Sequence, residues 1–327
     1  MVTRRHFIKT AAGVSLALSL PVPVIAGSKA PSDKWGKLLP QKPLGSTGDS
    51  VTTLGVGGFH IGRMDDAMAE ETIDLAIREG IRFFDTAESY QSGVSEQKYG
   101  KFLSPKYRDE VFLMTKTRAR NYKAAETDLR ESLNRLNTDR LDLWLMHAIQ
   151  DPGDVENRLN NGVLKFMQEA KAKGLVRHIG FSGHTNTSAH LELLKRSDEV
   201  EVCMMPINVV DTGYDSYINN VLPELLGKKK GVIAMKTLAG GSFFGRGFDG
   251  NRQANDTVMD HVSVSEAITY ALSIPNDVLV TGAKDPGMLQ EKIDIVNRFR
   301  QLSDDEMENL FRKVEHLSGG EVEYYKA

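Results

Sequence analysis

Short apolar runs alternate with amphipathic stretches along most of this chain. The apolar runs are rich in β-branched and aromatic residues and predict strands at 51–56, 81–84, 111–115, 141–146, 176–181, 200–205, 231–235 and 277–280. Stretches with helical spacing follow at 67–79, 96–103, 124–136, 163–173, 189–194, 217–226, 264–272 and 288–299, with one more at 304–317. Eight strands alternating with eight helices predict an α/β fold, namely a (β/α)8 TIM barrel with an extra C-terminal helix.

The residues before the first barrel strand predict a hairpin. Residues 41–44 and 51–56 are separated by the turn-forming segment 45–49, so the barrel domain should cover 41–327. Residues 27–40 are polar and contain two prolines, which indicates an exposed leader. A doubly wound open sheet is disfavoured, because no G-x-G-x-x-G turn opens a helix in this chain.

Residues 1–26 have the pattern of an export signal. Arg4, Arg5 and Lys9 precede an apolar stretch that is short and interrupted by proline, so a membrane-spanning helix is a poor fit. The paired arginines resemble a twin-arginine signal, which implies the twin-arginine export machinery as a partner and a periplasmic location. An ordinary secretion signal and an uncleaved anchor are the alternatives.

Composition restricts the class of partner. Hydrophobic residues make up 40% and charged residues 26% of the chain, and the formal net charge is −3, so nucleic acid is not an expected partner. The single cysteine, Cys203, lies in an apolar run and cannot form a disulfide within the chain. The eight histidines show no metal-ligand spacing, so no metal is expected.

Three strands end in polar residues at a regular spacing. Asp85, Lys116 and His147 follow three successive strands and are 31 residues apart, while Tyr90 lies on the loop after Asp85. Each residue alone is consistent with a helix cap or a surface charge. Because parallel strands in a barrel end at the same rim, we expect all four side chains to meet there.

These residues also resemble a known family. Asp85-Thr86-Ala87-x-x-Tyr90, Gly93-x-Ser95-Glu96, Lys116 and His147 are similar to the motifs of the aldo-keto reductases, over residues 42–299. The resemblance implies a tetrad in which Tyr90 donates a proton, Lys116 stabilises its phenolate, Asp85 holds Lys116 and His147 orients a carbonyl. It also implies a small carbonyl or alcohol substrate and a monomer.

The resemblance further implies a nicotinamide cofactor, NADP, with NAD as the alternative. Its expected contacts fall into groups: the nicotinamide pocket (Gly57, Gly58, Phe59), the carboxamide (Ser182, Asn208), the ring and pyrophosphate (Met235, Lys236, Thr237, Leu238, Gly240) and the adenosine phosphate (Gly282, Lys284, Met288, Glu291, Lys292). Gly282 and Met288 stand where relatives have lysine and arginine. Lys284, with help from Lys292, is therefore the expected phosphate ligand.

Two other functions fit parts of the pattern. A non-catalytic barrel could use the cofactor pocket as a sensor or interaction module, but it would not need Lys116 behind Tyr90. An aldolase could use Lys116 as a Schiff base, but this does not explain Ser182 and Asn208. The long segment 239–261 should either fold over the cofactor or be anchored to the barrel by Phe243, Phe244 and Phe248.

Overall fold

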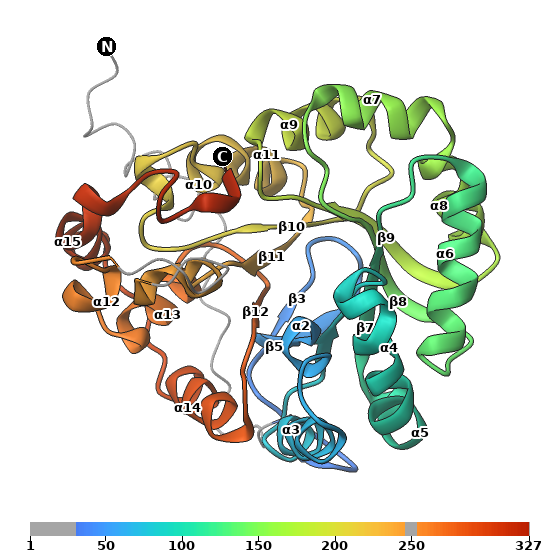
Figure 1. The fold of residues 1–327 in the computed structure, drawn as a ribbon, viewed down its shortest axis with the longest axis horizontal. Coiled ribbons are helices and arrows are strands. Elements are labelled where there is room, and N and C mark those ends of the chain that lie inside the picture. The colour runs from blue at the N-terminus through green and yellow to red at the C-terminus, as the bar shows by residue number, and fades with distance from the viewer. Residues whose placement is uncertain (1–30, 246–253, 327) are drawn as a thin grey trace.

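The structure is a computed structural model that describes residues 31–245 and 254–326 (Figure 1). The expected export signal at residues 1–26 and Phe248 lie outside the described residues. None of the described helices is both long enough and apolar enough to cross a membrane.

Eight parallel strands close into a barrel, which confirms the predicted fold (Figure 1). The first strand, β5, pairs with both β6 and β12, so the sheet has no open edge. The strands are β5 (Leu54–Gly57), β6 (Phe83–Asp85), β7 (Phe112–Thr117), β8 (Leu141–Met146), β9 (Val176–Ser182), β10 (Val202–Pro206), β11 (Gly231–Met235) and β12 (Val278–Thr281).

Helices surround the barrel. The longer ones are α3 (Asp66–Arg78), α6 (Tyr122–Arg135), α7 (Pro152–Asn160), α8 (Val163–Ala172), α9 (Thr187–Arg196), α13 (Val264–Ser273), α14 (Pro286–Asn297) and α15 (Asp304–Val314). Shorter ones are α2 (Gly58–Ile61), α4 (Val94–Lys98), α5 (Ser104–Tyr107), α10 (Tyr217–Asn220), α11 (Leu222–Gly227) and α12 (Val258–His261). Helix α7 was not predicted, because its sequence is mostly polar; Asp151 caps it and Pro152 opens it.

Two hydrophobic cores follow from the alternation of side chains along the strands. Phe83 points into the barrel, where it stacks on Phe112, and its neighbour Phe84 packs outward against the helices. Cys203 lies in the outer core and is fully buried. Leu44 of the N-terminal hairpin packs against the side chains of the inner core.

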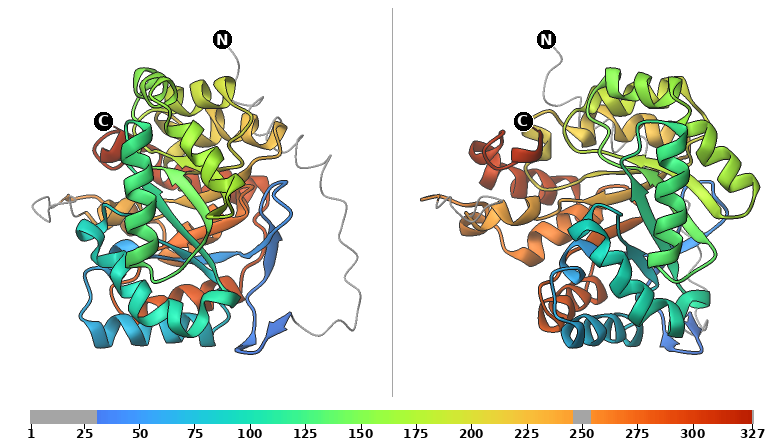
Figure 2. Two further views of the ribbon diagram at one scale, coloured as in Figure 1. Left: turned by 90° about the vertical axis from the view of Figure 1, so that its right-hand side faces the viewer. Right: turned by 45° about the vertical axis from the view of Figure 1, so that its right-hand side comes forward.

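That hairpin closes one end of the barrel, as predicted. It consists of β3 (Gln41–Pro43) and β4 (Ser50–Thr52), which pair antiparallel. In the left-hand view of Figure 2 the N-terminal hairpins lie to the right of the barrel and the C-terminus lies to the left. The other end of the barrel, where the parallel strands end, is open and lies on the same side as the C-terminus of the chain.

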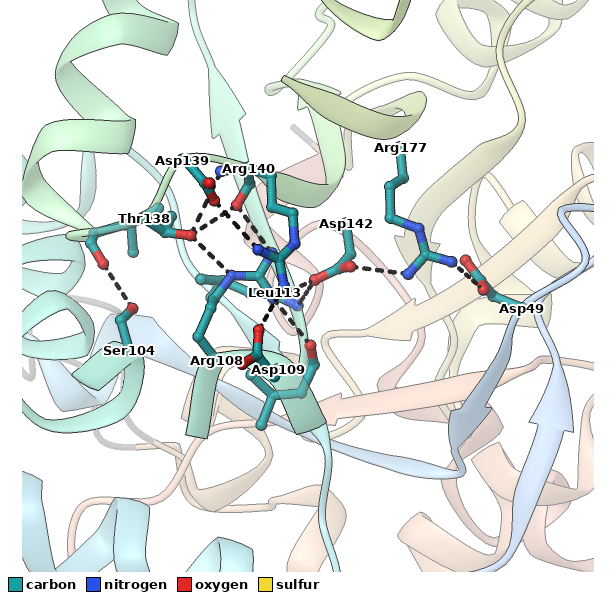
Figure 3. Close-up of polar contacts among 12 residues, drawn as sticks. Asp49, Ser104, Arg108, Asp109, Leu113, Thr138, Asp139, Arg140, Asp142 and Arg177 are labelled. Atoms are coloured by element: carbon teal, nitrogen blue, oxygen red, sulfur yellow. Dashed lines mark hydrogen bonds and ion pairs between the residues drawn. The ribbon is translucent and has the colours of Figure 1, made fainter. Parts of the chain in front are cut away.

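Ion pairs tie the hairpin to the barrel floor (Figure 3). The Asp142 carboxylate accepts a hydrogen bond from the Leu113 amide at 2.8 Å and pairs with Arg108 at 2.9 Å and Arg177 at 3.0 Å. Arg177 also pairs with Asp49 in the hairpin turn. Asp142 thus links strands β7, β8 and β9 to the hairpin.

The leader residues form a second small hairpin, β1 (Ser32–Asp33) with β2 (Gly36–Lys37). Most of its side chains are exposed, but Asp33 pairs with the buried Arg82 at 2.6 Å. The Arg82 guanidinium beside it lowers the pKa of Asp33. The leader is therefore attached to the barrel.

Candidate active site

Four polar side chains meet at the strand-end rim. Asp85 ends β6, Lys116 lies near the end of β7 and His147 follows β8, while Tyr90 begins a 3-10 helix after β6. The Lys116 ammonium contacts the Asp85 carboxylate and lies 3.2 Å from the Tyr90 hydroxyl. It also donates to the Thr86 carbonyl at 2.7 Å. The structure thus brings Lys116 into contact with two of the three partners expected from the sequence.

Burial controls the charges in this cluster. Asp85 and Lys116 are 2% and 1% exposed. Burial acts to lower the pKa of Lys116, but the Asp85 carboxylate and the Tyr90 hydroxyl outweigh it and raise that pKa. Burial raises the pKa of Tyr90, and Lys116 opposes the rise. Near neutral pH the site therefore holds a charged Lys116 and a protonated Tyr90.

The loop after Tyr90 has an unusual backbone. Gln91 and Ser92 have φ values of 48° and 54°, and Gly93 follows with φ of 93°. Non-glycine residues rarely adopt this left-handed conformation, which is costly and concentrates at functional sites. The strained turn immediately precedes α4, whose buried Glu96 is bonded to Thr115 of β7. The turn and α4 therefore fix the position of Tyr90.

His147 is a neutral imidazole next to Tyr90. Burial and the nearby Lys116 hold the pKa of His147 well below its usual range. Its Nδ1 lies 3.2 Å from the Ser89 hydroxyl and 4.0 Å from a Glu88 carboxylate oxygen, and its ring centroid is 5.8 Å from that of Tyr90. Its Nε2 makes no hydrogen bond to any residue that the structure describes. Nε2 is thus the nitrogen available to a bound molecule.

The predicted nicotinamide-pocket residues lie beside Tyr90. Gly57 ends β5, Gly58 opens α2, and the Phe59 ring packs edge-on against Tyr90 with centroids 5.4 Å apart. A Cβ atom on Gly58 would lie 2.5 Å from the Asp85 carbonyl oxygen, so only glycine fits there. This close approach brings Phe59 to the tetrad.

The two predicted carboxamide ligands are placed differently from one another. The Ser182 hydroxyl, at the end of β9, donates a hydrogen bond to the Met146 carbonyl, at the end of β8, at 3.4 Å. Asn208 is fully buried and its amide is already used: Nδ2 donates to Glu323 and Tyr325, both at 2.9 Å, and Oδ1 accepts from the Val210 amide. In this conformation Asn208 does not offer the free amide that the sequence predicted.

Gly183 follows Ser182, and the packing around it explains the glycine. A Cβ atom at this position would lie 2.7 Å from the His190 ring and 2.8 Å from the Ile149 carbonyl oxygen. A larger residue would have to displace the backbone after β8. Position 183 therefore has no room for a side chain that could contact a bound molecule.

Lys236 is a partly buried cation at the expected pyrophosphate position. It follows Met235 at the end of β11, and burial lowers the pKa of Lys236 to about 8. Within the described residues its ammonium group has no carboxylate partner and lies 5.2 Å from the Tyr325 ring centroid and 5.8 Å from that of Tyr324. Beyond it, the Thr237 hydroxyl is buried without a hydrogen bond, Leu238 is half-buried, and Gly240 has a φ of 66°.

The expected phosphate clamp is electropositive. Lys292 donates to the Gly282 carbonyl, and burial lowers the pKa of Lys292 to about 8. His60 lies against Gly282, where a Cβ atom would be 2.2 Å from its Nδ1. Burial, Lys292, Lys284, Arg63 and Lys236 together lower the pKa of His60 to about 4. Lys284 and Glu291 are exposed, and Met288 is half-buried on α14.

Segment 239–261 is anchored by one of the predicted phenylalanines. Residues Ala239–Phe244 form a 3-10 helix in which Phe243 is fully buried and Phe244 is exposed. Phe243 therefore attaches the start of the segment to the core.

Some contacts around the rim were not predicted from the sequence. Ser89 meets His147 across 58 residues, and the C-terminal residues Glu323 and Tyr325 reach Asn208. No local motif marks these pairs, because they depend on how distant loops pack. Nor did the spacing of histidines reveal that Asp256, His261 and His316 gather on the surface.

Comparisons with known proteins agree with this geometry. The model of the "Aldo/keto reductase family" matches residues 53–315. The uncharacterized oxidoreductase YqkF of Bacillus subtilis is 25% identical over 300 residues, covering 83% of this chain and 95% of that protein. L-galactose dehydrogenase of Arabidopsis thaliana is 30% identical over 218 residues, covering 61% of this chain and 66% of that protein.

Solved structures show the same fold. The aldo-keto reductase AKR11C1 of Bacillus halodurans, in its holo form, superposes with a TM-score of 0.71 at 21% identity, covering 84% of this chain and 96% of that one. An aldo-keto reductase of Klebsiella pneumoniae in complex with NADPH superposes with a TM-score of 0.64 at 20% identity, covering 85% of this chain and 96% of that one.

Proposed function

Since this chain belongs to the aldo/keto reductase family, we propose that it transfers hydride between a nicotinamide dinucleotide and a small carbonyl or alcohol. The substrate is an aldehyde, ketone or sugar carbonyl in the reducing direction. The observation that supports this most strongly is the buried contact of Lys116 with both Asp85 and Tyr90. A barrel that only bound a ligand would not need a charged lysine buried behind a tyrosine.

Each residue of the tetrad has a defined task in carbonyl reduction. The cofactor, when bound, supplies the hydride. Tyr90 gives its proton to the carbonyl oxygen, and Lys116 stabilises the phenolate that remains. Asp85 keeps Lys116 charged and in place. The neutral His147 presents Nε2 to the same oxygen, with Ser89 bonded to its Nδ1. In the reverse direction the Tyr90 phenolate accepts the proton of the alcohol.

The residues fit the charged half of a dinucleotide. The partly buried Lys236, the buried Lys292 and the exposed Lys284 would hold its phosphates, since none of the three forms an ion pair with a carboxylate among the described residues. NADP is the proposed cofactor, as in the Klebsiella pneumoniae relatives solved with NADPH and NADP. NAD is the alternative, because Gly282 and Met288 add no charge to the clamp. The Asn208 amide is not free to bind the nicotinamide carboxamide while it is bonded to Glu323 and Tyr325.

One experiment tests the proposal directly. The fluorescence of the buried Trp144, on the strand that leads to His147, would be titrated with NADPH and then NADH. Oxidation of NADPH would next be followed with a generic aldehyde. Saturable quenching and aldehyde-dependent oxidation are the expected results. Quenching without oxidation would favour a non-catalytic binding barrel.

We also propose that the chain is exported to the periplasm through a twin-arginine signal, from Arg4 and Arg5 at its start. This pathway carries folded proteins, so a cofactor could be bound before export and then kept. Replacing both arginines with lysine should retain the protein in the cytoplasm. Exported protein that contains no nucleotide would contradict the retained cofactor.

A further inference from the structure

Residues 319–326, here called the C-terminal segment, lie across the ends of β9, β10 and β11. The carbonyl oxygen of Tyr325 accepts from His184 Nδ1 at 3.2 Å, just beyond β9. The Tyr325 hydroxyl and Glu323 bind Asn208, just beyond β10. Val322 accepts a hydrogen bond from Ser242, in the 3-10 helix after β11. The segment therefore touches three neighbouring strand ends.

A buried ion cluster holds the end of this segment. The Lys326 ammonium pairs with Asp211 at 2.7 Å and with Glu323 at 2.9 Å, and it donates to the Tyr214 carbonyl at 2.8 Å. All three charged side chains are fully shielded from solvent. Breaking such a cluster without solvating its members is costly, so this is a built contact of the fold.

The segment uses the groups that a dinucleotide would need. Asn208, His184 and Lys236 face Tyr325. A Cβ atom on Gly240 would lie 2.7 Å from the Tyr324 hydroxyl, so Tyr324 approaches the backbone expected to receive the pyrophosphate, although Gly240 itself is exposed. The C-terminal segment thus uses groups that are expected to contact the nicotinamide half of the dinucleotide. The segment and that half of the dinucleotide would compete for these groups.

We propose that the C-terminal segment is an internal competitor of the dinucleotide, which must leave the strand ends before the nicotinamide half can bind. This inference rests on the proposed function. The apparent dissociation constant then equals the intrinsic one divided by the fraction of molecules with the segment displaced. If that fraction is about 0.01, the segment weakens nucleotide binding about 100-fold.

The test compares the full chain with a variant that ends at Gly320. NADPH binding would be measured by calorimetry and by Trp144 fluorescence. Asp211 keeps its bonds to Ser216, Tyr217 and Ile218 in the shortened chain, so the rim should stay folded, and circular dichroism would verify this. We expect NADPH to bind the shortened chain at least tenfold more tightly.

A point variant separates competition from general destabilisation. Tyr325→Ala removes the hydroxyl bond to Asn208 and the ring near Lys236, and it should also tighten NADPH binding. Tyr214→Ala is the control, since this exposed tyrosine gives the segment only its backbone carbonyl. Hydrogen exchange of residues 322–326 in the full chain should accelerate when NADPH is added.

The outcomes separate this inference from the proposed function. Equal NADPH affinity in the full and shortened chains, with residues 322–326 still protected, would overturn the competition and leave the proposed function intact. Folded chains that both fail to bind NADPH and NADH would overturn the cofactor assignment and this inference with it.

Asp256, His261 and His316 form a surface cluster away from the strand ends. Asp256 bonds His261 Nε2 at 2.6 Å through one carboxylate oxygen and His316 Nε2 at 2.9 Å through the other. The donor atoms lie within 4.8 Å of one another, and the two imidazole rings meet edge-on at 5.0 Å. His261 ends α12, and His316 lies in the 3-10 helix Glu315–Leu317 after α15. Two distant segments thus supply one cluster.

The donor set suits a first-row divalent metal ion. Two imidazoles and a carboxylate are ligands that Zn²⁺ accepts, with a water molecule as the fourth. A cavity of about 470 Å³, lined by Asp256 and His316, adjoins the cluster and leaves room for that water. We infer that Asp256, His261 and His316 form a surface site for Zn²⁺. The metal ion would connect the loop before α12 to the start of the C-terminal region.

Titration of the chelator-treated full chain with Zn²⁺ tests the site, and Co²⁺ supplies a visible spectrum that reports tetrahedral coordination. One saturable Zn²⁺ site is expected, and His316→Asn should weaken it at least tenfold. Asp305→Asn, an exposed acidic residue on α15, is the control and should change nothing. The inference fails if no saturable binding occurs or if His261→Asn and His316→Asn both leave it unchanged.

Discussion

The ammonium nitrogen of Lys116 lies 3.2 Å from the phenol oxygen of Tyr90 while it also contacts the Asp85 carboxylate. One cation therefore faces both the Asp85 carboxylate and a hydroxyl that becomes an anion when it gives up its proton. Burial keeps Tyr90 protonated at rest, and Lys116 lowers the cost of the phenolate. The following predictions begin from this relationship.

Tyr90→Phe should reduce carbonyl reduction by about 10²- to 10⁴-fold, because it removes the proton donor and leaves the ring in place. Nucleotide binding should be almost unchanged, since the hydroxyl contacts Lys116 and not the phosphate clamp. Steady-state rates and NADPH titration of the same preparation check both statements. Loss of nucleotide binding as well would mean that Tyr90 is structural.

Lys116→Met should destabilise the fold by about 3–5 kcal/mol, because it leaves the buried Asp85 without its cation. The double variant Asp85→Asn with Lys116→Met should recover part of that loss. Urea denaturation of the two variants measures the difference. An equal loss in both would show that the ion pair is not responsible.

Asp85→Asn should shift the pH dependence of reduction. The Asp85 carboxylate raises the pKa of Lys116, so its removal lowers that pKa. Lys116 then loses its charge at lower pH, and the alkaline limb of the rate profile moves to lower pH. Profiles of kcat for the two proteins test the direction. A shift to higher pH would contradict the proposed role of Asp85.

Asp142→Ala should cost about 3 kcal/mol of stability, because two arginines at the barrel floor lose their shared carboxylate (Figure 3). Asp139→Asn is the matched control: this exposed residue pairs only with neighbouring Arg140 at 3.3 Å, and its change should leave stability nearly unchanged. Neither variant should alter NADPH affinity, since the floor is opposite the rim. Thermal and urea unfolding provide the measurement.

Glu201→Gln should make the free energy of unfolding depend less on pH in acid. Bonds from His178 and Lys171 outweigh burial and lower the pKa of Glu201 from 4.5 to about 2. The unfolded chain therefore binds more protons between these values, and stability falls as pH decreases from 4.5 toward 2. The variant lacks this contribution. Unfolding midpoints across this range, with the exposed Glu199→Gln as control, decide the question.

Lys284→Met should weaken NADPH binding roughly tenfold and leave NADH binding unchanged, because only NADPH carries the 2′-phosphate. Lys284 is exposed near Lys292 at the predicted clamp. Lys123→Met, on the exposed face of α6, is the control. A preference for NADH in the unmodified chain would instead fit the uncharged Gly282 and Met288.

The barrel was predictable because its signals are local. Seven of the eight apolar runs became single strands, and their bounds differ by a few residues, as at 277–280 against Val278–Thr281. The run 51–56 is instead divided between the hairpin strand β4 and the barrel strand β5. Asp85, Lys116 and His147 could be placed at one rim because parallel strands share a direction. Helix α7 was missed because its first residues are set by a cap and a proline rather than by apolar periodicity.

The uses of Asn208 and of the C-terminal residues were not predictable. Asn208 meets Tyr325 across 117 residues, and neither sequence neighbourhood indicates the contact. The same holds for His316 and Asp256, which are 60 residues apart. Such pairs depend on how distant loops pack on the barrel, so they cannot be predicted from the pattern of strands and helices.

Cys203, buried in the outer core, has a consequence for where this protein can operate. Burial raises its pKa, so the reactive thiolate is scarce, and as the chain's single cysteine it has no partner. Oxidants that form disulfides therefore have nothing to join within the chain. The barrel should reach and keep the same covalent structure under reducing and oxidising conditions alike.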